Sequence, residues 1–500
     1  MHLNLGSILT ANASEQPDAE VLRAGDLTLR YGELDRAARG FAASLRERGI
    51  APGDKVAILV PNVPEFTVAY FGILLAGATV VPINVLAAAP EVTYFLEDSG
   101  ARLLVVHPLF EEAGREGAAP LGVPVVVAAG EDDDTVGAMA KAEPVETAHP
   151  TSPQDTAVIL YTSGTTGKPK GAELTHSNLL MNCAVVAPKL LPPREGGHRA
   201  LATLPLFHSF GQTVIQNAMI ASGGSMTLLA RFTPEDAFAL IERDRLSLFA
   251  GVPTMYFALL HHRGDRAYDV SSLEICMTGG APMPVDVMNS FEEKFNVEIL
   301  EGFGLSETSP VASFNMLGKP RKAGSIGYPA WGIELAIMDD EDRPLADDER
   351  GEICIRGHNI MKGYLNRPDA TKETLRNGWF HSGDIGYRDA DGCYWIVDRK
   401  KDMILRGGFN VYPREVEEVL YEHEDVVEAA VIGVPHESHG EEVKAIVALT
   451  PDASATPDDL QAFCKERLAA YKYPRMVEIV PELPKGPTGK ILKRELRDEG

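Results

Sequence analysis

Short apolar runs alternate with helix-like segments along the first 150 residues, and this alternation restricts the fold more than any other feature of the sequence. The runs are rich in β-branched residues and read KVAILV from Lys55, TVVPINV from Thr79, RLLVVH from Arg102 and VPVVV from Val123. Strands that alternate with helices are typical of a mostly parallel, doubly wound sheet covered by helices. We therefore expect an α/β fold.

The same pattern resumes after an acidic, proline-rich surface connection between Ala129 and Thr156. The runs AVIL, SLFAGVP and EICMTGGAP predict further buried strands. From Gly327 onward, ELAIMDD, GEICIRG and GCYWIVD are joined by Asp/Gly turns, which predicts a small antiparallel sheet or barrel.

The pattern changes again after Asp398, where an amphipathic helix, two strands and a second helix are expected. Thr456 and Pro457 are typical of the first turn of that second helix. The two helices should bury apolar stripes formed by Val416, Val419 and Leu420 and by Leu460, Phe463, Cys464 and Leu468. We expect a large domain over residues 1–397, a hinge over 398–402 and a small α/β domain over 403–500.

The charge and the cysteines exclude several partners and compartments. Lys and Arg number 47 against 72 Asp and Glu, so the net charge of −25 argues against nucleic acid or an anionic membrane as the main partner. The five cysteines have neither disulfide nor zinc-site spacing, which favours the cytoplasm. The start lacks the pattern of a signal peptide. The apolar stretch from Phe66 to Pro82 predicts a buried helix and strand and no membrane span.

The string YTSGTTGKPKG, Tyr161 to Gly171, follows the apolar strand AVIL and is the sharpest chemical signal. Its glycines, hydroxyl side chains and lysines can surround a polyphosphate without obstruction by Cβ atoms. The spacing differs from that of a P-loop NTPase. The candidate phosphate-binding residues are Thr162, Ser163, Gly164, Thr165, Thr166, Gly167 and Lys168.

This string resembles the signature of the adenylate-forming (ANL) superfamily, which contains acyl-CoA synthetases, luciferases and peptide-synthetase adenylation domains. Five more segments resemble other motifs of that superfamily in its order: LPLFHSFG (204–211), TGGAP (278–282), EGFGLSETSP (301–310), HSGDIGY (381–387) and DRKKDMILRGGFNVYPREVE (398–417). A last one, PKGPTGKILKREL, supplies Lys490. The resemblance implies a large N-terminal domain with doubly wound mixed sheets and a β-barrel-like sheet, and a small mobile C-terminal α/β domain.

The implied reaction has two steps: ATP and a carboxylate give acyl-AMP and pyrophosphate, and the acyl group then passes to the thiol of CoA. By resemblance, Glu307 binds Mg²⁺ and Ser306 a phosphate, while Asp384 and Arg399 hold the ribose. The other residues that the resemblance places around the nucleotide are Gly280, Ala281, Pro282, Glu301, Gly302, Phe303, Gly304 and Ile396.

The resemblance also assigns the residues that change role between the two steps. Lys490 bridges the carboxylate and the α-phosphate, and His208 positions the acid without acting as a base. Rotation about the hinge residue Lys401 brings Gly407 and Gly408 to the tunnel for the pantetheine arm of CoA. His436 and His439 have helical spacing, but no further ligand completes a metal site in the sequence, and a surface loop is expected there.

The acid is expected to be a medium- to long-chain fatty acid or a related polyketide-like acid. No carboxylate follows the aromatic segment to pair with an amino group, and Gly302 stands where aryl-acid relatives can carry a bulky residue, so we expect a deep tunnel. Position in the sequence suggests that Phe207, Phe210, Gln212, Val252, Gly279, Met283, Gly302 and Val311 line the pocket.

Three alternatives remain open from the sequence. The first is a fatty acyl-AMP ligase that loads an acyl carrier protein, and the second is a ligase for aryl or short-chain acids. The third is a nucleotide-binding regulatory module without catalysis. The monomer and the homodimer are both compatible with the sequence.

Overall fold

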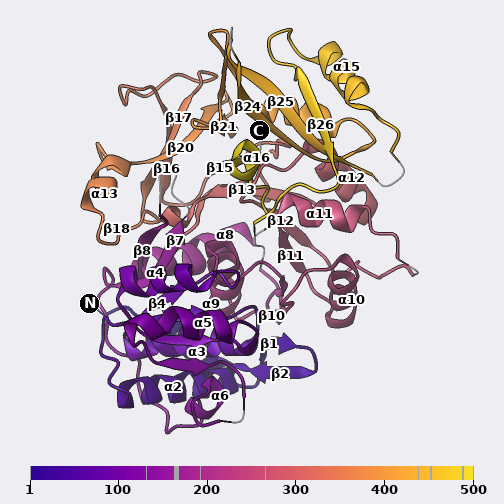
Figure 1. Ribbon diagram of the computed structural model, residues 1–500. Coiled ribbons are helices and arrows are strands. Elements are labelled where there is room, and N and C mark those ends of the chain that lie inside the picture. Colours follow the sequence, from indigo (N-terminus) through magenta and orange to yellow (C-terminus); the bar gives the residue numbers. More distant parts are fainter. Residues whose placement is uncertain are drawn as a thin grey trace.

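The structure is a computed structural model that describes residues 2–130, 132–162, 168–191, 193–264, 266–436, 439–450, 453–486 and 489–498 (Figure 1). Two mixed sheets, an antiparallel sheet and a C-terminal sheet organise these residues. No helix among them is both long and apolar enough to cross a membrane. The α/β fold expected from the alternating pattern is confirmed.

The first mixed sheet has seven strands, and those expected from the N-terminal runs form its parallel part. Its order is β18 (Gly363–Tyr364), β8 (Lys170–Thr175), β7 (Thr156–Thr162), β4 (Thr79–Pro82), β3 (Lys55–Leu59), β5 (Ala101–Val106) and β6 (Val125–Val127). β7 and β8 are antiparallel and enclose the phosphate-loop segment. The helices in this part of the chain are α1 (Ser7–Glu15), α2 (Tyr31–Glu47), α3 (Pro64–Ala76), α4 (Ala89–Ser99), α5 (Glu111–Ala118) and α6 (Val136–Met139).

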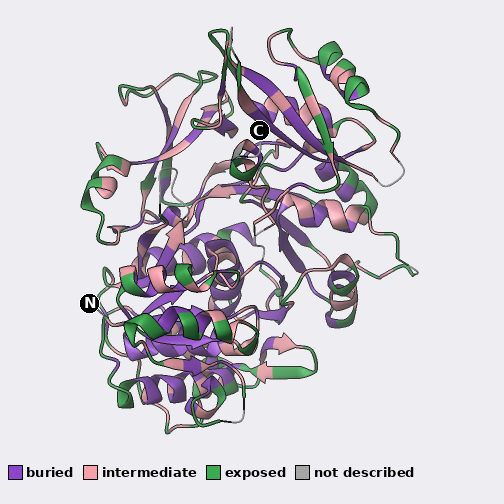
Figure 2. Cartoon of the chain, viewed as in Figure 1, coloured by how far each residue is buried: buried purple, intermediate pink, exposed green. Residues whose placement is uncertain are grey.

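Helix α3 and strand β4 account for the long apolar stretch. Pro64 lies in the first turn of α3, and all eleven residues from Phe66 to Ala76 are buried. Gly77 ends the helix in the left-handed conformation at φ +82°, and a Cβ there would lie 2.5 Å from the ring of His149. A helix that is apolar all round belongs in a core. Figure 2 shows buried residues running through this part of the large body, behind helices with exposed outer faces.

The second mixed sheet has nine strands, and its parallel part runs from β13 to β1. Its order is β15 (Tyr328–Pro329), β14 (Val311–Phe314), β13 (Ile299–Gly304), β12 (Ile275–Thr278), β11 (Leu248–Gly251), β9 (Arg199–Ala202), β10 (Ser225–Leu228), β1 (Glu20–Ala24) and β2 (Leu27–Arg30). The helices here are α7 (His176–Leu180), the π-helix η3 (Met181–Val186), α8 (Ala187–Leu190), the π-helix η4 (Phe210–Asn217), α9 (Ala218–Ala221), α10 (Pro234–Asp244), α11 (Pro253–Leu260) and α12 (Val285–Phe295). One hydrophobic core includes residues from both mixed sheets.

The turn-rich segment after Gly327 forms the expected antiparallel sheet, which is open. Its five strands are β16 (Ile333–Met338), β17 (Gly351–Gly357), β19 (Leu375–Arg376), β20 (Trp379–Arg388) and β21 (Tyr394–Arg399), with α13 (Pro368–Thr374) beside it. β20 carries the HSGDIGY motif and pairs with β21.

The chain beyond Asp402 has hydrophobic clusters separate from those of the large body. Its sheet contains β23 (Phe409–Val411), β22 (Ile404–Arg406), β25 (Gly440–Leu449), β24 (Val426–His436) and β26 (Met476–Val480), and its helices are α14 (Pro413–Tyr421), α15 (Pro457–Arg467) and α16 (Lys493–Asp498). Val416, Leu420, Leu460 and Cys464 are buried, and Thr456 caps α15 as expected. This part is yellow in Figure 1 and lies against the large body near α12.

Candidate active site

One cavity of about 1030 Å³ collects residues from nearly all of the motifs found in the sequence. β7 and the turn after β13 supply its polar end, whereas η4, β14 and Val252, the residue after β11, supply apolar walls. Residues of the C-terminal part reach it as well. The predicted residues that line it are Thr162, Phe207, His208, Phe210, Val252, Gly279, Gly280, Gly302, Phe303, Gly304, Ser306, Glu307, Val311, Arg399, Lys401 and Lys490.

The phosphate-loop segment begins where β7 ends. Thr162 and Lys170 line the cavity, and Lys170 lies over the ring of Tyr364 with its Nζ 5.2 Å from the ring centroid. Lys168 is exposed and lies over Tyr94, outside the cavity lining. The other predicted residues of this loop, Ser163, Gly164, Thr165, Thr166 and Gly167, lie outside the described residues.

Glu307 is buried in the wall of the cavity, in a 3₁₀ turn that follows β13. Its Oε1 accepts a hydrogen bond from the Thr162 hydroxyl at 3.2 Å and one from the Tyr364 hydroxyl at 2.9 Å. Burial and the nearby Glu307 charge raise the pKa of Tyr364, so its hydroxyl stays a donor. Sequence reasoning missed Tyr364, which reaches Glu307 from β18 across 57 residues of chain.

A carboxylate surrounded by hydroxyl groups offers the oxygen ligands that Mg²⁺ prefers. Glu307 has this surrounding, with the Thr162 and Ser306 hydroxyls nearby in the cavity lining. Mg²⁺ commonly takes one or two protein carboxylates and completes its shell with phosphate and water oxygens. The residues present therefore fit the ion.

Asp384 is almost fully buried in β20, and the nearby Arg399 guanidinium lies with its Nε 3.2 Å from the Asp384 Oδ1. The Oδ2 of Asp384 has no hydrogen-bond partner among the described residues. Burial raises the pKa of Asp384. Asp384 is not itself in the cavity lining, but its neighbours Ser382 and Gly383 are. A buried carboxylate oxygen without a partner is costly, and donors such as ribose hydroxyls would satisfy it.

Four more of the predicted nucleotide residues are absent from the cavity lining: Ala281, Pro282, Glu301 and Ile396. Glu301 is 2% exposed, and its Oε1 accepts a hydrogen bond from the Met283 backbone N–H at 3.1 Å. Burial raises the pKa of Glu301 to about 7. Glu301 thus ties the TGGAP turn to β13 from behind.

Lys490 and His208 both line the cavity, and the charge of Lys490 acts on His208. Burial, followed by the Arg399 charge, lowers the pKa of Lys490 to about 8. Burial, followed by the charge of Lys490, lowers the pKa of His208 to about 4, so the imidazole is neutral at pH 7. The loop that carries Lys490 is held to α11, because the Thr254 hydroxyl donates to the Gly489 carbonyl at 3.2 Å. The structure therefore presents Lys490 to the cavity.

The predicted hinge segment lines the cavity, whereas the predicted CoA-tunnel glycines do not. Lys401 lines the cavity, whereas Gly407 and Gly408 form the turn between β22 and β23 with φ of +58° and +83° and are absent from the lining. Two hydrophobic residues of the same hairpin, Leu405 and Phe409, are 52% and 56% exposed. In this arrangement the predicted CoA-tunnel glycines are on the surface, away from the acyl end.

The apolar end differs from the sequence prediction at Gly302. A Cβ on Gly302 would lie 2.2 Å from the ring of Phe314, its cross-strand partner on β14. The ring of Phe314 therefore already fills the space where a side chain at position 302 would lie, and the glycine does not open a deep tunnel there. A glycine is needed at position 302 because the Phe314 ring is present. The EGFG motif alone does not reveal that Gly302 on β13 pairs with Phe314 on β14.

Two of the predicted pocket residues, Gln212 and Met283, do not line the cavity. Gln212 is fully buried, and its amide donates to the Leu206 carbonyl at 3.2 Å, so it supports the LPLFHSFG turn from behind. Sequence reasoning missed Leu204, Val214 and Phe314, which do line it. Leu204 lies within a quoted motif, and Val214 lies four residues beyond Phe210 on the same helix, a spacing that could have suggested it.

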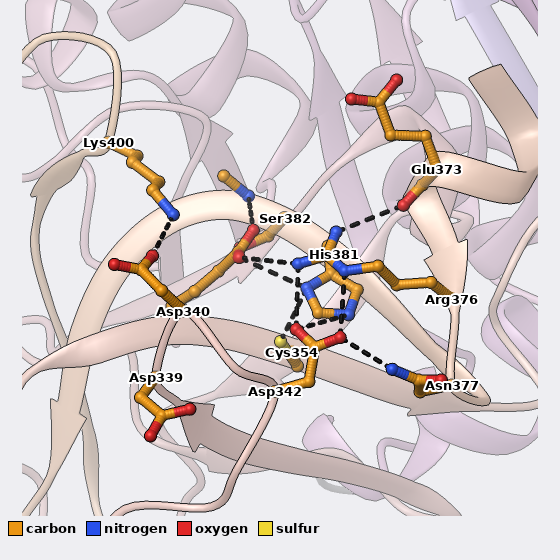
Figure 3. Close-up of polar contacts among 12 residues, drawn as sticks. Asp339, Asp340, Asp342, Cys354, Glu373, Arg376, Asn377, His381, Ser382 and Lys400 are labelled. Atoms are coloured by element: carbon orange, nitrogen blue, oxygen red, sulfur yellow. Dashed lines mark hydrogen bonds and ion pairs between the residues drawn. The ribbon is translucent and has the colours of Figure 1, made fainter.

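A polar cluster lies beside Asp384 at the edge of the same cavity (Figure 3). The Nδ1 atom of His381 lies 3.2 Å from Glu352 Oε2 and 3.4 Å from Cys354 Sγ, and Arg376 pairs with Asp342 at 3.0 Å. These side chains could approach a metal ion, but Arg376 also lies 3.6 Å from Glu352 and already supplies a positive charge. Glu352 accepts a hydrogen bond from the Gly383 N–H at 2.9 Å. The cluster thus fixes the turn that leads into Asp384.

A second group, His436 and His439 with Glu442, lies at the β24–β25 hairpin. The sequence analysis expects a surface loop at these histidines. Glu442 is a carboxylate close to the histidines that the sequence analysis did not find. It is paired with Arg406, whose NH2 donates to its Oε2 at 2.9 Å. This carboxylate is therefore engaged in an ion pair.

Known proteins resemble this chain over nearly its whole length. A family model described as AMP-binding enzyme matches residues 9–365, and one described as AMP-binding enzyme C-terminal domain matches residues 415–490. A long-chain-fatty-acid–CoA ligase of Bacillus subtilis is 38% identical over 527 residues, covering 99% of this chain and 94% of that protein. A feruloyl-CoA synthase of an Amycolatopsis species is 40% identical over 494 residues, covering 99% and 98%.

Among solved structures, the anthranilate CoA ligase AuaEII in complex with anthranoyl-AMP matches with a TM-score of 0.94 and 30% sequence identity. The match covers 100% of this chain and 97% of that one. The similarity extends across both the large body and the C-terminal part.

Proposed function

Since the chain belongs to the AMP-binding enzyme family and is an AMP-forming acid–CoA ligase, we propose that it activates a medium- to long-chain fatty acid or a related polyketide-like acid. The carboxylate oxygen attacks the α-phosphorus of ATP, and the bond to pyrophosphate breaks. The thiol sulfur of CoA then attacks the acyl carbonyl, AMP leaves, and the thiol proton passes to solvent. The observation that supports this most is the single cavity shared by Lys490, Glu307, Arg399 and an apolar end.

The first step concentrates negative charge on the phosphates, so the site needs fixed cations and donors. In our proposal, Lys490 bridges the carboxylate and the α-phosphate, and Asp384 with Arg399 holds the ribose. Glu307 would hold Mg²⁺, and the ion would offset the negative charge of the phosphates. Neutral His208 positions the carboxylate without removing a proton, in keeping with its pKa of about 4.

The second step requires Lys490 to leave the site. We propose that residues 403–500 rotate about a hinge at 398–402, with Lys401 as the pivot, and bring Gly407 and Gly408 to the acyl end. The separate hydrophobic clusters beyond residue 402 and the exposed glycine turn support this movement. We propose CoA as the acceptor in preference to an acyl carrier protein, and the buried, free cysteines favour a reducing cytoplasm.

A specific observation favours a second class of acid. Phe314 closes the space beside Gly302, and the rings of Phe210 and Phe314 both border the cavity, which suits a flat aryl group. The 40% identical relative is named for feruloyl-CoA synthesis. The second candidate is therefore an aryl or arylpropenoic acid.

The test is pyrophosphate release and thioester formation with ATP and Mg²⁺, measured across saturated acids of increasing length and a set of aryl acids, with and without CoA. We expect thioester formation that peaks at one fatty-acid length. A peak among the aryl acids would replace the fatty-acid proposal by the second candidate. Acyl-AMP formation without any thioester would contradict CoA as the acceptor.

A further inference from the structure

A second, much smaller cavity of about 10 Å³ lies behind the acyl end of the main one. It is enclosed by η3 and α8 on one side and by η4, β12 and β14 on the other. Val214 of η4 and Val311 of β14 line both cavities. These two valines therefore form a thin wall between the acyl end and the small cavity.

The chemistry of the small cavity suits a hydrocarbon better than water. Its lining is mostly aliphatic, with Val186 and Leu190 among the residues, and Asn182 and Thr213 are its polar members. The Asn182 amide is engaged, because it donates to the Val311 carbonyl at 3.2 Å. Thr213 Oγ1 has no partner among the described residues, and one hydroxyl is too little to hold a buried water, which needs two to four partners.

Val311 and Val214 differ in the contacts that fix their backbone. The Val311 carbonyl accepts hydrogen bonds from the side-chain amides of both Asn182 and Asn359, each at 3.2 Å. Val214 belongs to the π-helix η4, and it is the one residue of that helix that is half-buried. π-Helical turns are rare and often mark functional sites, and here two of them, η3 and η4, flank the small cavity. Val214 is thus the side chain that most directly separates the two spaces.

Phe314 bounds the acyl end beside Gly302. The Phe314 ring lies against Gly302 with no room for a Cβ, and Phe314 itself is 3% exposed. The acyl end is therefore bounded by Phe314 beside Gly302 and by Val214 and Val311 next to the small cavity.

We propose that the Val214–Val311 wall stops the far end of a linear acyl chain, and that the small cavity behind it is a latent distal acyl subsite, which a chain enters only when the side chain at position 214 is made smaller. The inference rests on the proposed function and deepens it. Val214 sets the longest chain that the enzyme accepts, whereas Phe314 limits the width of the acyl group near the carboxylate. As it stands, the space behind the wall is smaller than a methylene needs, so the chain-length limit lies at Val214.

The test compares Val214→Ala and Val214→Phe with the parent enzyme over saturated acids of 6 to 18 carbons. In Val214→Ala the two cavities merge, so the ratio of kcat/KM for long over short acids should rise about tenfold and the optimum should shift to longer chains. In Val214→Phe the same ratio should fall about tenfold, while hexanoate is still activated. The matched control is Ile215→Val, which trims a neighbouring buried residue of η4 outside both cavities and should keep the parent profile.

A second measurement separates this inference from the proposed function. Calorimetric binding of alkyl-AMP esters of the same lengths reports the acyl site without catalysis. A length dependence that moves with Val214 supports the distal subsite even if the acid activated in turnover is an aryl acid. Identical length profiles for the parent, Val214→Ala and Val214→Phe, in binding and in turnover, would overturn it. A complete lack of pyrophosphate release with every acid would instead contradict the proposed function alone.

Discussion

At the polar end of the cavity the side chains are charged or hydroxylated and lie in or beside quoted motifs, whereas at the apolar end several of them come from elements far apart in the chain. Thr162, Glu307 and Lys490 belong to strings with a chemical meaning of their own. Val214 and Phe314 acquire their positions only through packing. The reaction class is therefore determined by the residue types at the polar end, whereas the choice of acid depends on the shape of the apolar end.

The largest effect is expected at the polar end, from Lys490→Ala. Loss of a fixed donor at the phosphoryl group should reduce acyl-AMP formation about 100- to 1000-fold, while thiolysis of preformed acyl-AMP by CoA is spared. The two half-reactions are measured separately, as pyrophosphate exchange and as thioester release. Lys485→Ala is the matched control, because Lys485 lies in the same segment but pairs with Glu428 outside the cavity. Equal loss of both half-reactions would contradict the assigned role of Lys490.

The second effect tests the apolar end through Gly302→Ala. Because its Cβ would lie 2.2 Å from Phe314, we expect a destabilisation of about 1–3 kcal/mol and loss of acid activation. The double variant Gly302→Ala/Phe314→Ala should regain folding and accept wider acids than the parent. Urea unfolding and an acid panel measure both properties.

The control for this pair is Gly137→Ala, since a Cβ on Gly137 meets nothing within 4 Å. If Phe314→Ala fails to rescue Gly302→Ala, the two residues do not form the wall described here.

The third prediction concerns pH and again the polar end. The protonated form of Lys490 is the one that offsets the phosphate charge, and its pKa is lowered to about 8. Titration of Lys490 should therefore leave the adenylation rate at saturating substrate unchanged well below pH 8. Well above pH 8 the rate should fall up to tenfold per pH unit. Arg399→Gln removes a neighbouring positive charge, so the falling limb should move to higher pH. A limb that stays in place would show that another group controls it.

The smallest effect is expected from Tyr364→Phe. It removes one of the two hydroxyl donors to Glu307, at 2.9 Å, and a hydrogen bond to a charged group contributes about 1.5–3 kcal/mol. We expect the apparent KM for ATP·Mg²⁺ to rise about tenfold with a smaller change in kcat. Tyr328→Phe, whose hydroxyl donates to the Pro320 carbonyl at 3.1 Å on the surface, should behave like the parent. No difference between the two variants would remove Tyr364 from the Glu307 site.

Much of the fold could be predicted from local patterns. The buried strands from Lys55, Arg102 and Ala157 and the capped helix at Thr456 are found where the sequence placed them. Those predictions rest on side-chain periodicity and capping, which act over a few residues and need no knowledge of distant contacts.

The pocket was predicted less well, for a physical reason. Gln212 lies on η4 close to Phe210, but it faces Leu206 behind the cavity, whereas Val214 faces the cavity. Neighbouring residues on a helix point in different directions, so a motif locates the helix but not the face that it presents. Tyr364 and Glu307 are 57 residues apart, and their contact depends on the pairing of β18 with β8.

The sequence by itself determined the α/β class and the order of the motifs, and the resemblance of those motifs to a known family implied the chemistry of acid activation, because glycine, hydroxyl and charged residues at fixed spacing can be recognised locally. The tertiary structure alone decided how the acyl end is closed. There Phe314 fills the space that Gly302 leaves, and Val214 meets Val311 across a thin wall. Shape at that end is the sum of contacts between distant segments, since apolar packing is non-directional and depends on which surfaces the fold brings together.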